Sequence, residues 1–427
     1  MDALFNYFIS MNENYDVIIC GTGLKECILS GLLSQKKLKV LHVDNNDYYG
    51  GDCASLNISK LWQKFNPTHP DPPTSLGHNR DWNTDVIPKF VMAFGKLVKI
   101  LIFTKVSKYL EWKPIKGSYV YQFKKGGIFS DDKGVICKVP ANDSEALHSD
   151  LMGFFEKNRM RKFINFVNKY KADDPKTHKK KFDMIKNTSK ELMERYSLEP
   201  NTIDFIGHAI SLYDTDDFLN KPPTEFINRL KLYMDSAGRY GDSPFLYPIY
   251  GLGGIPEGFS RMSALHGATY MLRANVEEIL FDTNGQANGI RCGSDKAAAK
   301  MIICDPSYAL KISGKLKKTG QILRCVSILD HPLPNTDGAE SVQIIIPQKQ
   351  VGRKNDIYIA AISAAHAVCP KGLWIAIIST VIETSKPELE IKLALQLIGK
   401  SMHQFTWVSD SYEPSTDGKT DKVIIII

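Results

Sequence analysis

Gly21, Gly23 and Asp44 are the residues whose types and spacing could bind a cofactor. The two glycines follow an apolar run at 17–20, and Asp44 closes a second apolar run at 40–43, 23 residues beyond Gly21. A glycine turn between a strand and a helix can bring backbone N–H groups to a pyrophosphate, and an acid ending the next strand can hold a ribose hydroxyl. The spacing predicts the strand, turn, helix and strand of a dinucleotide-binding unit.

Two neighbouring residues weaken that interpretation. Cys27 stands where the G-x-G-x-x-G pattern has its third glycine, and it adds bulk where helix and strand must approach closely. Asp52 follows the glycine pair of DYYGGD, where a carboxylate facing a diphosphate would be repelled. Two interpretations stay open, which are a cofactor site and a scaffold that has lost its cofactor.

Other patterns that carry chemistry are missing from the sequence. It has neither G-x-S-x-G nor H-E-x-x-H, and none of its eight cysteines forms a C-x-x-C pair. Segment 394–401 ends like a phosphate loop, but Ala394 replaces the required first glycine. His208, in an expected helix, is interpreted as a core histidine. We therefore predict no catalytic residue and no metal site.

The composition is typical of a globular protein in a reducing compartment. Of 427 residues, 43% are hydrophobic and 24% are charged, and the net charge is +7. The basic residues are scattered in short groups rather than gathered in a stripe, so nucleic acid is not expected as a partner. No apolar run approaches bilayer length. We expect a cytoplasmic protein with buried free thiols.

Hydrophobic periodicity divides the chain into sheet-rich and helical parts. Residues 1–141 and 236–427 carry short apolar runs and glycine turns typical of strands, whereas 142–235 carry helical patterns. We predict an α/β domain built from the two outer segments, with an all-α domain inserted between them. Local predictions are a helix at 90–101 and hairpin turns at Asn284-Gly285 and Asn288-Gly289.

The helical part is unusually rich in bulky apolar residues. Core packing is the default interpretation of such a set. Some helix faces, however, carry apolar residues nearly all round, which is more than a small helical core needs. An apolar ligand groove is therefore the alternative interpretation.

Long motifs then point to a family. They include YDVIICGTGLKECILSGLLS, KVLHVDNNDYYGGD, LMGFFEKNRMRKF, SPFLYPIYGLGGIPEGFSR and VSDSYEPSTDG. From Tyr15 to about Lys419 the chain resembles the Rab GDP dissociation inhibitor family, relatives of the Rab escort proteins. The resemblance implies a flavoprotein-like, Rossmann-type fold with no flavin and no enzyme activity. It also implies a monomer that binds prenylated Rab GTPases in the GDP form, slows GDP release and extracts them from membranes into the cytosol.

The resemblance also implies which residues act. The outer segments would carry a Rab-binding platform that includes, by motif match, Tyr49, Arg80, Gly254, Glu257, Arg261, Thr269 and Met271. An effector loop implicated in membrane recognition would include Arg239, Tyr240 and Ser243. The helical part would hold the geranylgeranyl lipid in a groove lined by Leu151, Phe155, Phe163, Phe166, Ile206 and Ile210. Gly21, Gly23 and Asp44 would be vestigial, with no cofactor and no metal bound. The protein would be cytoplasmic and associate transiently with membrane surfaces or recruitment factors.

The sequence departs from the family pattern in several places. Gly254 stands where the family commonly has Glu. This difference calls into question one charged hydrogen bond that the resemblance implies to the GTPase. Residues 1–10 form an extension, 122–131 resemble an insertion, and the chain ends without the expected terminal helix. Two alternative functions are kept, which are a flavin-dependent amine-oxidase-like enzyme on the same scaffold and a Rab escort protein.

Overall fold

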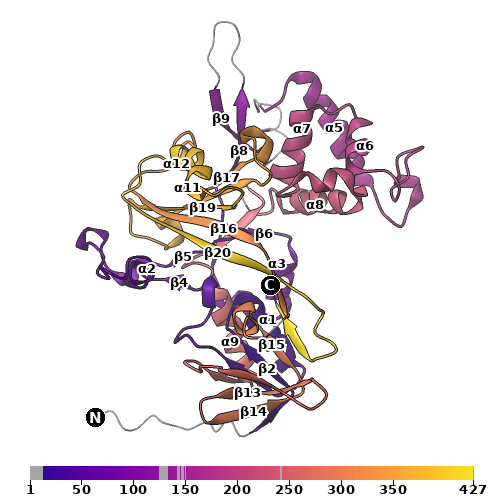
Figure 1. The fold of residues 1–427 in the computed structure, drawn as a ribbon. Coiled ribbons are helices and arrows are strands. Elements are labelled where there is room, and N and C mark those ends of the chain that lie inside the picture. Colours follow the sequence, from indigo (N-terminus) through magenta and orange to yellow (C-terminus); the bar gives the residue numbers. More distant parts are fainter. Residues whose placement is uncertain are drawn as a thin grey trace.

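The structure is a computed structural model, drawn in Figure 1, that describes residues 13–124, 133–141, 145, 149, 151–240, 243–312 and 314–426. The expected extension at 1–10 and most of the expected insertion at 122–131 lie outside the described residues. Figure 1 shows a parallel-sheet unit at the bottom, a larger sheet above it and a group of helices beside that larger sheet.

A five-stranded parallel sheet carries the predicted cofactor-binding unit. Short apolar strands of this kind are typical of a sheet that is buried on both faces. The strand order is β11-β3-β2-β15-β21. The bounds are β2 Val17–Cys20, β3 Val40–Val43, β11 Thr269–Met271, β15 Ile302–Cys304 and β21 Val423–Ile425.

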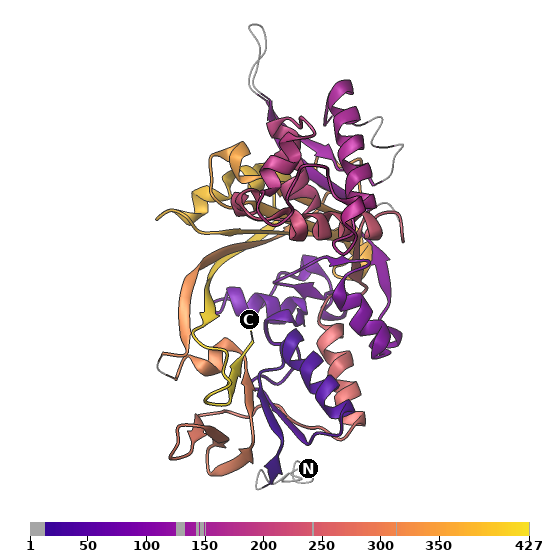
Figure 2. The same ribbon diagram turned by 90° about the vertical axis from the view of Figure 1, so that its right-hand side faces the viewer.

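The two faces of the parallel sheet are covered by different layers. Val17 and Ile19 point to the face that packs against α1 (Leu24–Gln35), whereas Ile18 and Cys20 point to the opposite face because side chains alternate along a strand. α1 in turn packs on α9 (Gly254–Leu265), as Figure 2 shows. The result is a helix layer and two sheet layers.

A four-stranded sheet covers the second face, in the order β1-β14-β13-β12. Its strands are β1 Asn14–Tyr15, β12 Glu278–Phe281, β13 Ala287–Cys292 and β14 Asp295–Ala299. The predicted hairpin turn at Asn284-Gly285 is confirmed between β12 and β13. The one predicted at Asn288-Gly289 is wrong, because both residues lie inside β13. The turn before β14 instead contains Gly293, whose φ of 59° suits glycine.

A seven-stranded sheet forms the second body of the molecule. Its strand order is β20-β16-β19-β18-β17-β8-β9, and every neighbouring pair is antiparallel except β17 with β8. One face packs against α12 (Lys392–Ile398) through Ile391, Ala394 and Ile398. β16 and β20 run down toward the parallel sheet (Figure 2). The bounds are β8 Gly117–Lys124, β9 Lys133–Lys138, β16 Leu316–Leu329, β17 Ser341–Ile346, β18 Ile357–Ser363, β19 Trp374–Val381 and β20 His403–Pro414.

Short strands connect the two bodies. They are β4 Ser55–Leu56, β5 Thr84–Asp85, β6 Val91–Met92, β7 Trp112–Pro114 and β10 Phe245–Pro248. The helix predicted at 90–101 is wrong in its first half, because β6 pairs with Phe245 and Leu246 of β10. That pairing is non-local and leaves no trace in local periodicity. The helix there, α3, begins after Gly95 and spans Lys96–Phe103.

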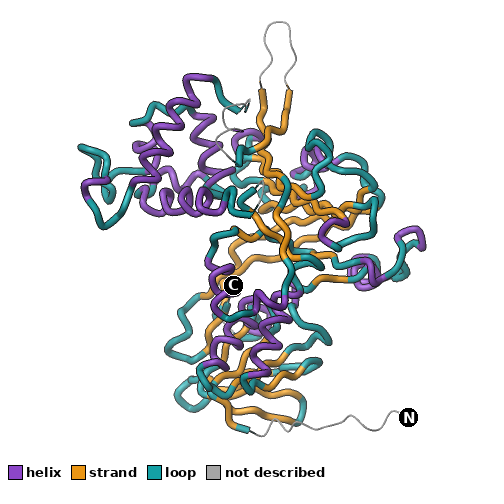
Figure 3. The backbone as a smooth tube through the Cα atoms, turned by 180° about the vertical axis from the view of Figure 1, so that it is seen from behind, coloured by secondary structure: helices purple, strands orange, loops and turns teal. Residues whose placement is uncertain are grey.

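The helices between β9 and β10 pack together beside the seven-stranded sheet (Figure 3), and we call residues 151–236 the helical block. A capping box at Thr188 and Glu191 begins α6, and Pro200 begins α7. α7 continues directly into a π-helix, η6. The block's helices are α5 Phe154–Lys169, α6 Ser189–Glu194, α7 Pro200–Asp204, η6 Phe205–Ile210 and α8 Pro223–Ser236.

Shorter helices lie between these elements. α2 spans Ile58–Phe65, α10 spans Pro306–Ala309 and α11 spans Pro387–Glu390. The 3-10 turns are η1 Gly51–Cys53, η2 Thr74–Leu76, η3 Asn79–Asp81, η4 Val106–Tyr109, η5 Pro175–Thr177, η7 Asp216–Asn220, η8 Gln348–Val351 and η9 Ala364–His366.

Gly207 in η6 offers a test of the packing in the helical block. A Cβ at this position would overlap the ring of Phe218, and neither group can move freely because Phe218 is buried. We expect Gly207→Ala to lower the free energy of unfolding by roughly 1–3 kcal/mol, despite the higher helix propensity of Ala. Chemical denaturation measures the change. Gly320→Ala, where a Cβ meets nothing within 4 Å, is the control and should be nearly neutral.

Candidate functional site

The glycine turn after β2 is held from both sides. Gly21 has a φ of 101°, and its N–H donates to the carbonyl of Val43 at 2.8 Å. The buried imidazole of His42 lies with Nε2 2.6 Å from the carbonyl oxygen of Gly21. A Cβ on Gly21 would lie 3.0 Å from Cβ of Asp305, so the turn is also closed from the β15 side. This position therefore requires glycine for conformation and for space.

Asp44 is fully engaged by neighbouring groups of its own chain. Its side chain is buried, and Oδ2 accepts hydrogen bonds from the Thr22 backbone N–H at 2.6 Å and the Thr22 hydroxyl at 2.5 Å. Oδ1 accepts from the backbone N–H and the side-chain amide of Asn46, at 2.8 and 2.9 Å. Both oxygens are thus used inside the protein, rather than held ready for a ribose.

Glu26 covers the N-terminus of α1. A Cβ on Gly23 would lie 2.5 Å from Oε2 of Glu26, so the carboxyl group lies directly over the turn. Burial raises the pKa of Glu26 to about 7, and the nearby Asp305 and Asp44 act in the same direction. A flavin pyrophosphate is an anion that would need this helix end and its N–H groups. The residues present do not fit such a group, because carboxyl groups surround the turn.

Cys27 takes part in helix packing instead of leaving an open turn. Its thiol donates to the carbonyl of Thr22 at 3.2 Å and lies 3.3 Å from the hydroxyl of Ser260 on α9. The close approach of α1 and α9 occurs one turn later, where a Cβ on Gly31 would overlap Met262. The sequence suggested that the bulk of Cys27 would hinder helix packing. The structure accommodates this side chain in hydrogen-bonded contacts with Thr22 and with Ser260.

Tyr49 lies on the loop after β3, close to α9. Its ring packs edge-on against Tyr270 of β11 with centroids 5.7 Å apart, and Tyr270 in turn lies 4.6 Å from His42. Partial burial raises the pKa of Tyr49, with a smaller contribution from the charge of Glu257. Tyr270 and the buried His42 thus position this half-buried tyrosine.

An open concavity of about 470 Å³ lies beside Tyr49. It brings together four of the predicted platform residues, which are Tyr49, Arg80, Gly254 and Glu257. Sequence reasoning missed the polar and aromatic residues around them, because these come from separate loops. The missed residues are Tyr48, Asn57, Lys60, Asn79, Trp82, Asn83 and Tyr250.

Asp85 joins the segments beneath the concavity through hydrogen bonds. Its Oδ1 accepts from the Ser55 hydroxyl at 2.6 Å, and its Oδ2 accepts from the backbone N–H of Leu252 at 2.7 Å and from the hydroxyl of Tyr247. The Ser55 hydroxyl in turn accepts from the Gly253 N–H at 2.9 Å. Burial raises the pKa of Asp85 to about 6. This network fixes the loop that begins α9 and so positions Gly254 and Glu257.

The other predicted platform residues lie outside the concavity lining. Arg261 is exposed on α9, with its guanidinium 4.9 Å from the ring centre of Tyr109. Thr269 and Met271 are half-buried on β11, the edge strand next to β3. These residues are on neighbouring elements, so they extend the surface around the concavity rather than its interior.

The predicted effector-loop residues differ in their surroundings. The guanidinium of Arg239 stacks over Phe94 at 4.4 Å, and the Tyr240 side chain is 52% exposed. Ser243 is buried and accepts a hydrogen bond from the N–H of Phe245 at 3.3 Å. Residues 241 and 242 of the loop lie outside the described residues.

The predicted groove residues do not share one accessible surface. Phe163 and Ile206 are fully buried core residues, and Leu151 and Ile210 are also buried. Phe166 is half-buried against Tyr196. Phe155, by contrast, is 77% exposed and packs edge-on against the equally exposed Phe154, with ring centroids 5.7 Å apart. The sequence could not separate these cases, because exposed and buried phenylalanines occur in the same helix, α5.

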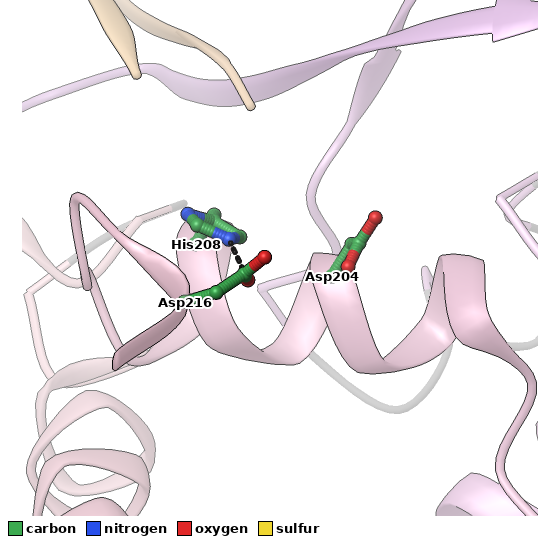
Figure 4. A group of neighbouring side chains, drawn as sticks. All are labelled: Asp204, His208 and Asp216. Atoms are coloured by element: carbon green, nitrogen blue, oxygen red, sulfur yellow. Dashed lines mark hydrogen bonds and ion pairs between the residues drawn. The ribbon is translucent and has the colours of Figure 1, made fainter. Parts of the chain in front are cut away.

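His208 is a satisfied core histidine, as expected, but in a charged network (Figure 4). Its Nδ1 lies 2.8 Å from Asp356 and its Nε2 lies 3.2 Å from Asp216. Burial alone would lower the His208 pKa, but the two carboxylates outweigh burial and raise it to about 10. The oxygens of Asp204 and Asp216 lie near enough to His208 to hold a metal ion by geometry. The ammonium group of Lys349 bonds to both carboxylates instead.

Among the described residues, no helix is both long enough and apolar enough to cross a bilayer.

Comparison with known proteins gives consistent matches over almost the whole chain. A family model described as GDP dissociation inhibitor matches residues 11–427. A Schizosaccharomyces pombe protein named "Probable secretory pathway GDP dissociation inhibitor 1" is 50% identical over 97% of this chain and 91% of its own length. An Arabidopsis thaliana protein named guanosine nucleotide diphosphate dissociation inhibitor is 49% identical over 97% of this chain and 90% of its own length. The resemblance drawn from the sequence is confirmed.

Solved structures give the same result for the fold. The crystal structure of a Rab GDI from Plasmodium falciparum matches with a TM-score of 0.91 at 47% identity, over 97% of this chain and 92% of that one. An oxidoreductase from Methanosarcina mazei matches with a TM-score of 0.60 at 15% identity, over 96% and 94% of the two chains. The second likeness concerns the fold alone. Together they confirm the predicted flavoprotein-like α/β fold.

Replacing Glu26 tests the account of the closed turn. The pKa of Glu26 is about 7 in the folded chain, against an ordinary value of 4.5. Its contribution to stability is therefore full below pH 4.5 and is lost as pH rises through about 7. We expect Glu26→Gln to raise the free energy of unfolding by roughly 1–3 kcal/mol more at pH 8 than at pH 5. Chemical denaturation at the two pH values measures this difference.

Glu388→Gln, on the exposed surface of α11, is the matched control and should leave the pH dependence of the wild type unchanged. If Glu26→Gln behaved like this control, the Glu26 carboxyl would not be confined over the turn.

Proposed function

The chain belongs to the GDP dissociation inhibitor family, and from this premise we propose that it binds prenylated Rab GTPases in their GDP form. It slows GDP release, extracts the GTPase from membranes and returns it through the cytosol during vesicle traffic. The Plasmodium falciparum structure with the same fold is itself titled a Rab GDI. A Rab escort protein is the second family function that the sequence left open.

The concavity beside Tyr49 is the observation that best supports this proposal. It gathers Tyr49, Arg80, Gly254 and Glu257 with further tyrosine and asparagine side chains. Aromatic and arginine residues in an open, polar concavity are typical of protein interfaces. A GTPase occupies this surface in the proposed function.

Nucleotide selectivity must come from the same surface. If the lipid were bound equally well in both nucleotide states, its binding would not distinguish the GDP form of the GTPase from the GTP form. GTPases differ between their GDP and GTP forms in switch segments that the γ-phosphate orders. The platform therefore contacts those segments, and Arg261, on the same helix as Glu257, extends the contact beyond the concavity.

The helical block carries the lipid in this proposal. At about 0.8 kcal/mol per buried CH₂, a C20 chain contributes on the order of 10 kcal/mol or more of membrane affinity, which an extractor must match. The exposed pair Phe154 and Phe155 offers apolar surface at the start of α5. Phe163 and Ile206 reach the lipid only if the helices separate, because both are fully buried.

We also propose that the chain acts without a flavin and is not an enzyme. The turn that would receive the pyrophosphate is covered by Glu26, and Asp44 is committed to Thr22 and Asn46. A purified protein carrying stoichiometric flavin would instead favour an amine-oxidase-like enzyme. We expect a monomer that contacts the membrane surface only transiently.

Extraction from liposomes tests the main proposal. Geranylgeranylated Rab is loaded with GDP or with a non-hydrolysable GTP analogue, bound to liposomes and mixed with the protein. After sedimentation, Rab·GDP should appear in the supernatant and the GTP form should stay with the liposomes. Equal extraction of both forms, or of neither, would contradict the proposal. Support of Rab prenylation in catalytic amounts would favour the escort function.

Tyr49→Ala and Arg261→Ala should each weaken the binding of Rab·GDP by ~1–3 kcal/mol, because large aromatic and arginine side chains dominate such interfaces. Calorimetry or fluorescence titration measures the dissociation constants. Tyr412→Ala, on β20 and outside the concavity, is the matched tyrosine control and should leave the affinity unchanged. Unchanged affinity in both test variants would remove these residues from the platform.

Gly254→Glu should tighten binding to a generic Rab·GDP. The new acid would lie in the first turn of α9, where a negative charge is favoured, and would add a charged hydrogen bond to the concavity. Its Cβ would lie 3.0 Å from a terminal methyl of Leu110, which must shift slightly. Gly254→Ala separates this crowding from the effect of charge in the same titration. Equal or weaker binding by Gly254→Glu would mean that the surface is used differently.

A further inference from the structure

A network of charges, in which Asp204, His208 and Asp356 are buried and Lys349 is half-exposed, joins the helical block to the seven-stranded sheet. The helical side contributes Asp204, His208 and Asp216, which Figure 4 shows on and beside η6. The sheet side contributes Lys349 of η8 and Asp356, which precedes β18. The two sides are far apart in the sequence, so these contacts form only when the block is seated on the sheet.

Lys349 is the central cation of this network. Its Nζ lies 2.9 Å from Oδ1 of Asp204 and 2.9 Å from Oδ2 of Asp216. The other oxygen of Asp216 lies 3.2 Å from His208. Asp204 is buried, so Lys349 provides the charge that such a carboxylate needs away from water.

Asp356 completes the network from the sheet side. Its Oδ2 lies 2.8 Å from Nδ1 of His208, and its Oδ1 accepts from the N–H of Gln348 at 2.9 Å. Its own backbone N–H donates to the carbonyl of Asp214 at 3.3 Å. One side-chain oxygen and the backbone N–H of this fully buried residue therefore join the block to the sheet, and the other oxygen is held within the sheet side.

We propose that Lys349 and Asp356, with Asp204, His208 and Asp216, form a clasp that fixes the position of the helical block on the sheet. This inference rests on the proposed function, in which the concavity beside Tyr49 holds the GTPase and the block holds its lipid. A GTPase and its attached lipid are two linked ligands, and the gain from linkage depends on the span between the two sites. The clasp sets that span, so its members are positioning residues.

The chemistry of the contacts supports a geometric role over simple adhesion. A buried ion pair adds little stability compared with well-packed apolar residues, but it tolerates few alternative arrangements because every charge needs its partner. Three carboxylates here share one lysine and one histidine. A shifted block would leave at least one buried charge unpaired, so the seated position is strongly preferred.

Lys349→Met tests the clasp by removing its central charge. Two dissociation constants are measured by titration in detergent-free buffer, one for lipid-free Rab·GDP and one for geranylgeranylated Rab·GDP. We expect the first to stay within about twofold of the wild type and the second to rise about tenfold or more, because the gain from linkage is lost. Lys349→Arg, which keeps the charge, should restore much of the second affinity.

Lys190→Met is the matched control, because Lys190 pairs with Glu194 on the surface of α6 and does not reach the sheet. It should leave both constants unchanged. Asp216→Asn provides a second test if Lys349→Met folds poorly, since it removes one charge from the same contact, and we expect the same selective loss.

The outcomes separate the clasp from the proposed function. If the test variants lose thermal stability but keep the wild-type ratio of the two constants, the network is only structural and the clasp is overturned. If the wild type itself binds neither form of Rab·GDP, the proposed function fails, and the positioning role fails with it.

Discussion

The carboxylate of Asp44 is the constraint on which the functional face depends. Four donors from Thr22 and Asn46 surround it in a buried site, and hydrogen bonds to a charged acceptor are stronger than neutral ones. The backbone N–H of Gly50 donates to the Thr22 carbonyl at 2.9 Å, and that of Ala274 donates to the Asp44 carbonyl at 2.8 Å. The turn after β2, the loop after β3 and the segment after β11 are thus held as one unit, and this unit presents Tyr49.

The same interactions explain how a flavoprotein-like fold could present the protein-binding surface that we propose. The donors that a dinucleotide would use are satisfied by Asp44 and Glu26, and Asp305 closes the turn from the other side. The fold is shared with an oxidoreductase at 15% identity, but the chemistry belongs to the residues at the site. With the turn closed, the loops above it are free to form the concavity beside Tyr49.

Local patterns predicted β2, the glycine turn, α1 and β3, because these elements follow one another in the sequence. They failed where distant segments meet. The helix expected at 90–101 gave way to strand pairing with Phe245, and the lining of the concavity comes from loops that no periodicity connects. Phe155 and Phe163 show another limit, since the same residue type in one helix is exposed in one case and buried in the other. Lys349 gave no sequence signal at all, because its partners lie more than a hundred residues away.

The proposed function explains why a charged contact between the two bodies would matter. Lipid affinity alone would extract both nucleotide forms, whereas platform contacts alone could not offset the membrane affinity of a C20 chain. Extraction that is both strong and selective requires the two contributions to act on one ligand at once. The seated helical block lets them do so, because His208 meets Asp356 and Lys349 meets Asp204 only in that position. In the proposed function the apolar surface near Phe155 then supplies affinity, and the concavity beside Tyr49 decides which state of the GTPase receives it.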